Sequence, residues 1–212
     1  MPAKKEKQTT DLNTEQKIKA AAKIVFHKKG FAAARTRDIA EEAGMNTALL
    51  NYYFRSKEKL FQLIMFETIS GFMQNMGMVF NDDETTFEKK VELLAENYID
   101  LFLMEPEIPL FVMSEIRSRG AEILERMPAA GSIMQSVFIK QFKAFAEKGK
   151  IMETNPLHFM MNLMSMIVFP FIGSPILKMV GKLKEQQFEK LMQERKKLIP
   201  VWVKAILKAN KY

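Results

Sequence analysis

Apolar residues recur at three- and four-residue intervals along most of the chain, and no stretch shows the two-residue alternation of a half-buried strand. This periodicity predicts an all-α protein. The first helix is predicted to start at Asn13 or Thr14, either of which can cap it, and Gly30 is expected to end it after Lys29. The apolar face of this helix is made by Ile18, Ala21, Ala22, Val25 and Phe26.

The stretch 36–57 predicts two short helices that meet at a tight turn. Gly44 stands where a left-handed residue would end the first of them, and Met45 after it is expected to be a buried plug. The first helix has one narrow apolar stripe, made by Ile39, Ala40 and Ala43.

Either Asn46 or Thr47 can cap the second short helix. Leu50 and Phe54 lie four residues apart and are expected to point into the core. A glycine turn followed by a short helix with an exposed polar and aromatic face is typical of a helix-turn-helix, whose second helix fits a major groove. The alternative is an ordinary helical hairpin whose face merely meets water. The outward face consists of Thr47, Ala48, Asn51 and Tyr52.

Basic residues bracket this motif and favour contacts with phosphate. Lys57 falls in the first turn of the next helix, where free backbone N–H groups and a cation together favour a phosphate oxygen. The residues predicted to contact DNA are Arg35, Thr36, Arg37, Asn46, Thr47, Ala48, Asn51, Tyr52, Tyr53 and Lys57.

These residues resemble the DNA-binding segment of the TetR (tetracycline-repressor) family, over about residues 14–66. That family's pattern reads approximately I-x-x-A-A-x-x-x-F-x-x-x-G-[YF], then I-A-x-x-A-G-V-S, then L-Y-x-H-F-x-x-K-E-x-L. The chain departs from it at Ala48, Asn51 and Tyr53, where the family usually has Gly, Tyr and His. The resemblance implies a dimeric transcriptional regulator with a three-helix DNA-binding unit. The matching positions are Ile18, Ala21, Ala22, Phe26, Gly30, Phe31, Ile39, Ala40, Ala43, Gly44, Leu50, Phe54, Lys57, Glu58 and Leu60.

The distribution of charge supports a nucleic-acid partner. The net charge is +7, from 32 basic and 25 acidic residues. Residues 1–60 hold 13 of the basic residues and 7 of the acidic ones, so the segment with the helix-turn-helix carries almost all of the excess. Hydrophobic content of 48% with 27% charged residues is ordinary for a globular protein.

The chain is predicted to have three parts. Residues 1–12 form a flexible basic arm, residues 13–66 the DNA-binding domain with its motif at about 34–53, and residues 67–212 a larger helical bundle for ligand binding and dimerisation. Pro200 is predicted either to kink the last helix or to begin a second piece of it. The helices expected after the motif are 56–80, 85–104, 109–119, 132–148, 155–169, 174–180 and 184–206, with a break at 127–131.

One long stretch, Thr154–Leu177, has no charged residue apart from neutral His158. Its length invites a transmembrane interpretation, but polar and Gly/Pro interruptions and the lack of basic flanks argue against it, so no membrane is expected. An all-apolar helix must be covered on every side, so this helix and the final one are predicted to form a homodimer through a four-helix bundle. Burial within the monomer is the alternative.

Methionine is abundant, with 17 in the chain, and its flexible side chain repacks readily around apolar partners. A pocket for a hydrophobic small-molecule effector is therefore one hypothesis, and a plain core is the other. The residues predicted to line the pocket are Tyr98, Met104, Met113, Arg117, Met134, His158, Met161 and Met164.

The sequence offers no catalytic constellation. It has no cysteine, its two histidines, His27 and His158, lie far apart, and no Gly-rich phosphate loop or metal-ligand spacing occurs, so no catalytic residue, cofactor, metal or enzyme activity is predicted. The start of the chain lacks a secretory signal, and a cytoplasmic location is expected. The chain is predicted to be a repressor that a small molecule releases from a palindromic operator. The alternative is a TetR-like DNA-bound partner or chromosome-organising protein without a ligand.

Overall fold

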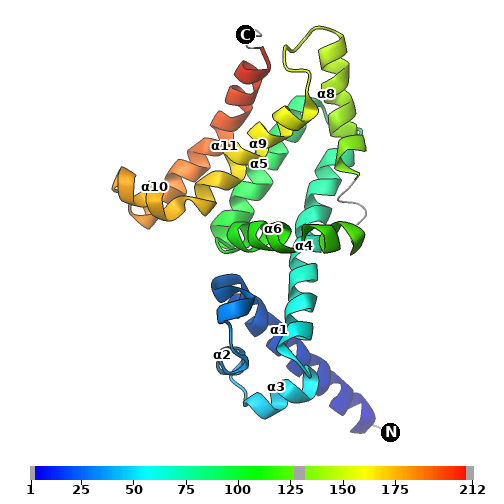
Figure 1. The fold of residues 1–212 in the computed structure, drawn as a ribbon, viewed down its shortest axis with the longest axis vertical. Helices are drawn as coiled ribbons and strands as arrows, with labels where there is room; N and C mark the ends of the chain where they lie inside the picture. The colour runs from blue at the N-terminus through cyan, green and yellow to red at the C-terminus, as the bar shows by residue number, and fades with distance from the viewer. Residues whose placement is uncertain (1–2, 127–131, 209–212) are drawn as a thin grey trace. The chain divides into compact units, whose positions relative to one another are not determined.

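The computed structural model describes residues 3–126 and 132–208, and every regular element in those two ranges is a helix. The prediction of an all-α protein is therefore confirmed (Figure 1). The chain divides into two compact units, Met1–Ser70 and Gly71–Tyr212. The predicted break at 127–131 lies outside the described residues.

The first unit contains α1 (Ala3–Ala33), α2 (Thr36–Glu42), α3 (Thr47–Tyr53) and the start of α4 (Lys57–Asn81). Helix α1 begins at Ala3, so most of the stretch 1–12, predicted to be a flexible arm, is helical. Residues 3–8 are Ala, Lys, Glu and Gln, all good helix formers, and the sequence cue of a cap at position 13 was misleading. Gly30 interrupts the helix as predicted, with φ 67° and ψ 178°.

The core of the first unit forms where α1, α2, α3 and α4 turn their apolar faces together. The Phe61 ring packs edge-on against Phe26, with 5.0 Å between centroids, and it is tilted against the Phe31 ring at 4.9 Å. Ser56 caps α4 by accepting a hydrogen bond from the Lys59 N–H at 3.2 Å. Further fully buried residues of this core are Ile18, Ala22, Ile39, Leu50, Leu60, Ile64 and Met65.

The second unit begins within α4 and continues through a series of helices. In Figure 1, α5, α9 and α11 lie side by side, and α8 contacts both α5 and α9. Their buried faces meet in a cluster of phenylalanines, in which Phe138 stacks on Phe87 at 5.0 Å and Phe142 stacks on Phe159 at 4.8 Å. The helices are α5 (Phe87–Met104), α6 (Ile108–Arg126), the 3₁₀ turn η1 (Ile133–Gln135), α8 (Val137–Glu147), α9 (Pro156–Ile172), α10 (Ser174–Gly181) and α11 (Glu185–Lys208).

Local capping explains where several of these helices begin. Thr86 accepts a hydrogen bond from the Lys89 N–H at 3.2 Å, and Asn155 accepts one from the Leu157 N–H at 2.9 Å, so each caps the helix that follows it. The helix predicted from residue 132 begins later, at Val137. Ser136 is the reason, because its backbone is extended and its hydroxyl caps the Ile139 N–H.

Helix α11 runs without a break through Pro200. Proline removes one intrahelical hydrogen bond, but Ile199 and Val203 on either side of it are buried and hold the helix against its neighbours. Over the described residues, no single helix is long and apolar enough to cross a membrane. The pair α9 and α10, bent by 72°, has the length and composition for one only when taken together.

Two buried polar side chains form hydrogen bonds within the second unit, one to helix α4 and one to the connection before α5. The Tyr98 hydroxyl donates a hydrogen bond to the Phe72 carbonyl at 3.1 Å, which fixes α5 against α4. The Lys90 ammonium is fully buried and donates to both the carbonyl and the hydroxyl of Thr85 at 2.7 Å, which fixes the connection between these helices. Burial lowers the pKa of Lys90.

Candidate nucleic-acid interface

The turn between α2 and α3 is closed by backbone hydrogen bonds. The Gly44 N–H donates to the Glu41 carbonyl at 3.1 Å, and the Met45 N–H donates to the Ala40 carbonyl at 2.9 Å. This pair of bonds is the Schellman motif, which needs a left-handed residue, and Gly44 provides it with φ 65°. The predicted role of Gly44 is confirmed. Met45 is only half-buried, so it is not the buried plug that was predicted, because the turn lies at the surface.

Helix α3 is held in place by its cap and by one buried side chain. The Asn46 side chain accepts a hydrogen bond from the Leu49 N–H at 2.8 Å, so Asn46 rather than Thr47 is the cap. Leu50 is 1% exposed and anchors the helix to the core. Phe54 follows the helix in an extended conformation and is half-buried, a shallower position than the sequence predicted.

The opposite face of α3 is open to solvent. Ala48 and Asn51 are exposed, and Tyr52 is 78% exposed. The Tyr52 ring meets the half-buried Tyr53 ring edge to face, with 5.3 Å between centroids. An exposed ring that packs mainly on a neighbouring ring contributes little to the core, and it is available for contact with sugar or phosphate.

Ion pairs shape the entrance of α2. The Asp38 carboxylate accepts a hydrogen bond from the Arg35 N–H at 3.0 Å and pairs with Lys29 at 2.9 Å. These contacts, that of Lys29 first, lower the pKa of Asp38. Arg37 pairs with Glu41 at 2.8 Å, which raises its pKa, and its side chain is 82% exposed. The cations predicted to face phosphate at this end are thus solvent-facing and partly paired within the protein.

Lys57 has a different environment from the one its position in the sequence suggests. Its ammonium donates hydrogen bonds to the carbonyls of Phe31 and Ala34, both at 3.0 Å, and lies 4.2 Å from the centre of the Phe31 ring. Two of its three N–H donors are therefore used to join the first turn of α4 to the end of α1. These partners lie 26 and 23 residues earlier in the chain, and no local pattern indicates them.

Of the eight residues predicted to line a ligand pocket, Tyr98 and Met104 line one hollow together, between α4 and α5, and the eight differ widely in exposure. Tyr98 is buried and bonded to a backbone carbonyl, whereas Met104 is 74% exposed and Met161 is 58% exposed. His158 faces solvent and lies 3.7 Å from Glu153. Helical spacing places methionines on a common face but does not determine which face is covered, so the pocket at these residues stays a prediction. Of the remaining four, Met113 and Arg117 are exposed, and Met134 and Met164 are half-buried.

A cavity of ≈ 520 Å³ occurs elsewhere in the second unit, between α5, α8 and α11. None of the eight predicted residues is among the described residues that line it. Its apolar floor comes from helix faces that read as ordinary core in the sequence, so no local signal distinguishes them. Over the described part of the chain, no group of three or more His, Asp or Glu side chains could hold a metal ion.

A capped short helix with a polar and aromatic outer face, set after a Schellman turn and among basic residues, defines a helix-turn-helix DNA-binding protein. Residues 18–64 match the family model described as bacterial regulatory proteins, tetR family. The DNA-binding segment of the chain is therefore of the tetR-family type, and the chain as a whole is similar to transcriptional regulators.

Relatives of known name agree with this assignment. The chain is 25% identical to the "Probable HTH-type transcriptional regulator YttP" of Bacillus subtilis, covering 94% of this chain and 96% of that protein. It is 31% identical to the repressor NicS of Pseudomonas putida, covering 53% of this chain and 52% of NicS. Its fold is similar to that of the regulator FadR of Bacillus subtilis, solved with stearoyl-CoA, with TM-score 0.56, 17% identity and coverage of 87% and 96%.

Proposed function

We propose that this TetR-family regulator is a cytoplasmic homodimeric repressor, which binds a palindromic operator through α3 and is released from it by a hydrophobic small molecule. The observation that carries the proposal is the exposed face of α3, with Asn51 and Tyr52 directed away from the core. Repression is supported by the names of two relatives, the repressors NicS of Pseudomonas putida and BdcR of Escherichia coli.

Dimerisation is supported by apolar side chains that remain exposed on two helices. On α9, Leu157, Met161 and Phe169 are 55%, 58% and 59% exposed and recur at multiples of four residues. On α11, Leu198 and Val201 are 42% and 60% exposed. Apolar stripes of this kind usually mark interaction surfaces, and the same surfaces on a second copy would complete a four-helix bundle.

A twofold dimer explains why the operator should be palindromic. Two copies of α3 related by a twofold axis read the same sequence on opposite strands, and successive major grooves on one face lie about 34–36 Å apart. Selection of binding sites from random DNA should therefore return inverted repeats with one helical turn between half-site centres. Selection of single, unrepeated sites would overturn the dimeric model of recognition.

The dimer itself can be tested by one charge at the centre of the exposed stripe. Met161→Glu would bring two carboxylates into the proposed interface, so the variant should sediment as a monomer and lose operator affinity. Met78→Glu is the matched control, because Met78 is 67% exposed on α4 and lies outside the proposed interface. If Met161→Glu remains a dimer, the assignment of this surface is wrong.

Release by a small molecule is tested by reciprocity. A ligand that favours the non-binding form of the dimer by about 2–3 kcal/mol would weaken operator binding roughly 30–150-fold, and operator DNA must weaken the ligand by the same factor. Since FadR was solved with stearoyl-CoA, acyl-CoA compounds are the first to screen. Equal ligand affinities with and without operator would reject the release mechanism and favour a DNA-bound protein that needs no ligand.

A further inference from the structure

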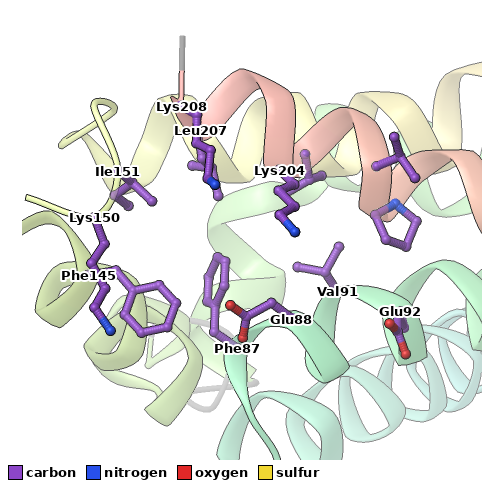
Figure 2. A pocket seen from close by; sticks show the side chains of 13 residues that line it. Phe87, Glu88, Val91, Glu92, Phe145, Lys150, Ile151, Lys204, Leu207 and Lys208 are labelled. Carbon is purple, nitrogen blue, oxygen red and sulfur yellow. The ribbon is translucent and has the colours of Figure 1, made fainter. Parts of the chain in front are cut away.

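The cavity between α5, α8 and α11 has a closed apolar floor. Phe87 and Val91 of α5 are 3% and 2% exposed, and Val203 and Leu207 of α11 are each 4% exposed. Figure 2 shows Phe87, Val91 and Leu207 around one hollow, with the Phe145 ring at its α8 end. Because the side chains that close this floor are apolar, an occupant of the cavity would meet apolar surface there rather than polar groups.

One end of the cavity is fixed by the backbone. The Met152 N–H donates a hydrogen bond to the Leu207 carbonyl at 2.6 Å, which holds the connection after α8 against the last turn of α11. Ile151 in that connection is 7% exposed and contributes to the lining. The hollow is therefore held on three sides by elements that are bonded or packed to one another, as expected of a site that exists before its ligand binds.

The rim of the cavity is mainly basic. Lys150, Lys204 and Lys208 line it, and in Figure 2 Lys204 and Lys208 extend from α11 toward the floor. Within the described residues, neither Lys204 nor Lys208 has an ion-pair partner. Of the two carboxylates on the rim, Glu92 pairs with Lys89 at 3.0 Å, which leaves Glu88 as the one to oppose the ammonium groups.

We propose that this cavity binds an amphipathic anion. The acyl or aromatic body of the anion would lie on the apolar floor, and its carboxylate or similar head group would lie at Lys204 and Lys208. The volume of ≈ 520 Å³ lies within the range of about 300–1,000 Å³ that small-ligand sites occupy. A neutral apolar molecule would cover the floor but leave the lysines without a partner, and a cation would be repelled. Binding of this anion does not depend on the proposed function. Only the further step, that the anion is the effector that releases the operator, rests on it.

Three probes of equal chain length separate the contributions of floor and rim. Decanoate, decan-1-ol and decylammonium share one alkyl chain and differ in head-group charge. Calorimetric titration of the 212-residue protein, below the micelle concentrations of the two charged probes and the aqueous solubility of decan-1-ol, should give the tightest binding for decanoate and the weakest for decylammonium. Raising the salt concentration should weaken only decanoate, since exposed charge interactions are screened. Equal affinities for decanoate and decylammonium would overturn the proposal.

Variants then locate the binding site. Lys204→Gln should weaken decanoate by about two- to fivefold and leave decan-1-ol unchanged, as expected for one partly exposed charge. Glu88→Gln should change decanoate binding in the opposite direction. Lys197→Gln is the control, because Lys197 is exposed on the same helix and is not part of the lining. If Lys204→Gln and Lys197→Gln have the same effect, decanoate does not bind in this cavity.

A parallel measurement of operator affinity distinguishes this inference from the proposed function. If decanoate binds as described but leaves operator affinity unchanged, the site stands and its ligand is not the releasing effector. If another compound releases the operator while decanoate fails to bind, the proposed function stands and this inference fails. The two readouts use the same protein and differ only in whether DNA is present.

Discussion

The ammonium of Lys57 lies 4.2 Å from the centre of the Phe31 ring and donates a 3.0 Å hydrogen bond to the carbonyl of the same residue. A second bond reaches the Ala34 carbonyl. One side chain thus holds the beginning of α4 against the end of α1. Its sequence position suggested a phosphate contact, and its geometry suggests that stability is its first role.

Lys57→Ala should therefore lower the free energy of unfolding by about 1–3 kcal/mol, because two partly buried carbonyls lose a charged donor. Chemical denaturation measures this, with the exposed neighbour Lys59→Ala as control. The slope of log K against log salt for DNA binding should stay nearly constant. A fall in that slope by about one, without loss of stability, would instead assign Lys57 to a phosphate.

Gly44 and Gly77 should respond to the same substitution with opposite signs. A methyl group at either position meets no atom within 4 Å, so packing does not distinguish them. Gly44 has φ 65°, where alanine costs about 1–2 kcal/mol, and valine more because it is β-branched. Gly77 lies inside α4, where alanine should stabilise by about 0.5–1 kcal/mol.

Thermal unfolding of Gly44→Ala, Gly44→Val and Gly77→Ala checks this order. Gly44→Asn serves as a further control, since asparagine tolerates left-handed backbone better than other residues. Stabilisation by Gly44→Ala would show that the turn does not have the Schellman geometry in solution. Specific DNA binding by Gly44→Val at unchanged affinity would lead to the same conclusion.

Substitutions at two asparagines distinguish the stability of α3 from its recognition of bases. Asn46→Ala removes a cap and should cost about 0.5–2 kcal/mol of stability. Asn51→Ala should leave stability unchanged but alter which bases are preferred, by roughly 1–3 kcal/mol, and changes at Thr47 or Ala48 should act similarly. Denaturation together with binding-site selection measures both effects. Unaltered base preference in Asn51→Ala would mean that another face of α3 meets the DNA.

Glu115 gives a prediction for pH. This side chain of α6 is buried, and burial raises its pKa, although Arg119 at 3.7 Å lowers it and Glu122 raises it. The folded state therefore holds the proton more tightly than the unfolded chain does. The stabilisation from that proton is present below the ordinary pKa of the carboxyl group and is lost as pH rises through the raised one.

Glu115→Gln, which resembles the protonated form at every pH, should be more stable than the parent protein at pH 8. Its advantage should shrink as pH falls through the raised pKa and should vanish below the ordinary range of a carboxyl group. Unfolding free energies measured from pH 4 to pH 8 give the profile. Glu189→Gln, at an exposed position on α11, should show no such trend. A profile parallel to that of the parent would refute the prediction.

The features predicted well from the sequence are those determined by neighbouring residues. Asn46, Thr86 and Asn155 cap helices because a side-chain oxygen reaches an N–H two or three residues away, and Gly44 closes a turn made by its own neighbours. Such local chemistry was sufficient to predict the helix-turn-helix and most helix boundaries.

The features predicted poorly depend on which helix faces pack against other helices in the folded protein. Met104 and Met161 lie on helical stripes that resemble core, yet both face solvent. Val91 and Val203, which line the cavity, also lie on stripes that resemble core. Whether one face of a helix is covered depends on the elements that pack against it, which can be distant in the sequence. For the same reason, no pattern in the sequence indicates that Lys57 bonds to residues more than twenty positions earlier.

Helix α4 passes through the boundary between the two units, which falls between Ser70 and Gly71, and ends at Asn81. A fragment cut at Ser70 would expose four carbonyls that have no partner, because each needs an N–H four residues further on. At Asn81, by contrast, the side-chain amide donates to the Gly77 carbonyl at 3.1 Å and covers the end of the helix. A DNA-binding fragment made for isotope labelling should therefore extend to Asn81, because the helix that closes the first unit has its last turns in the second unit.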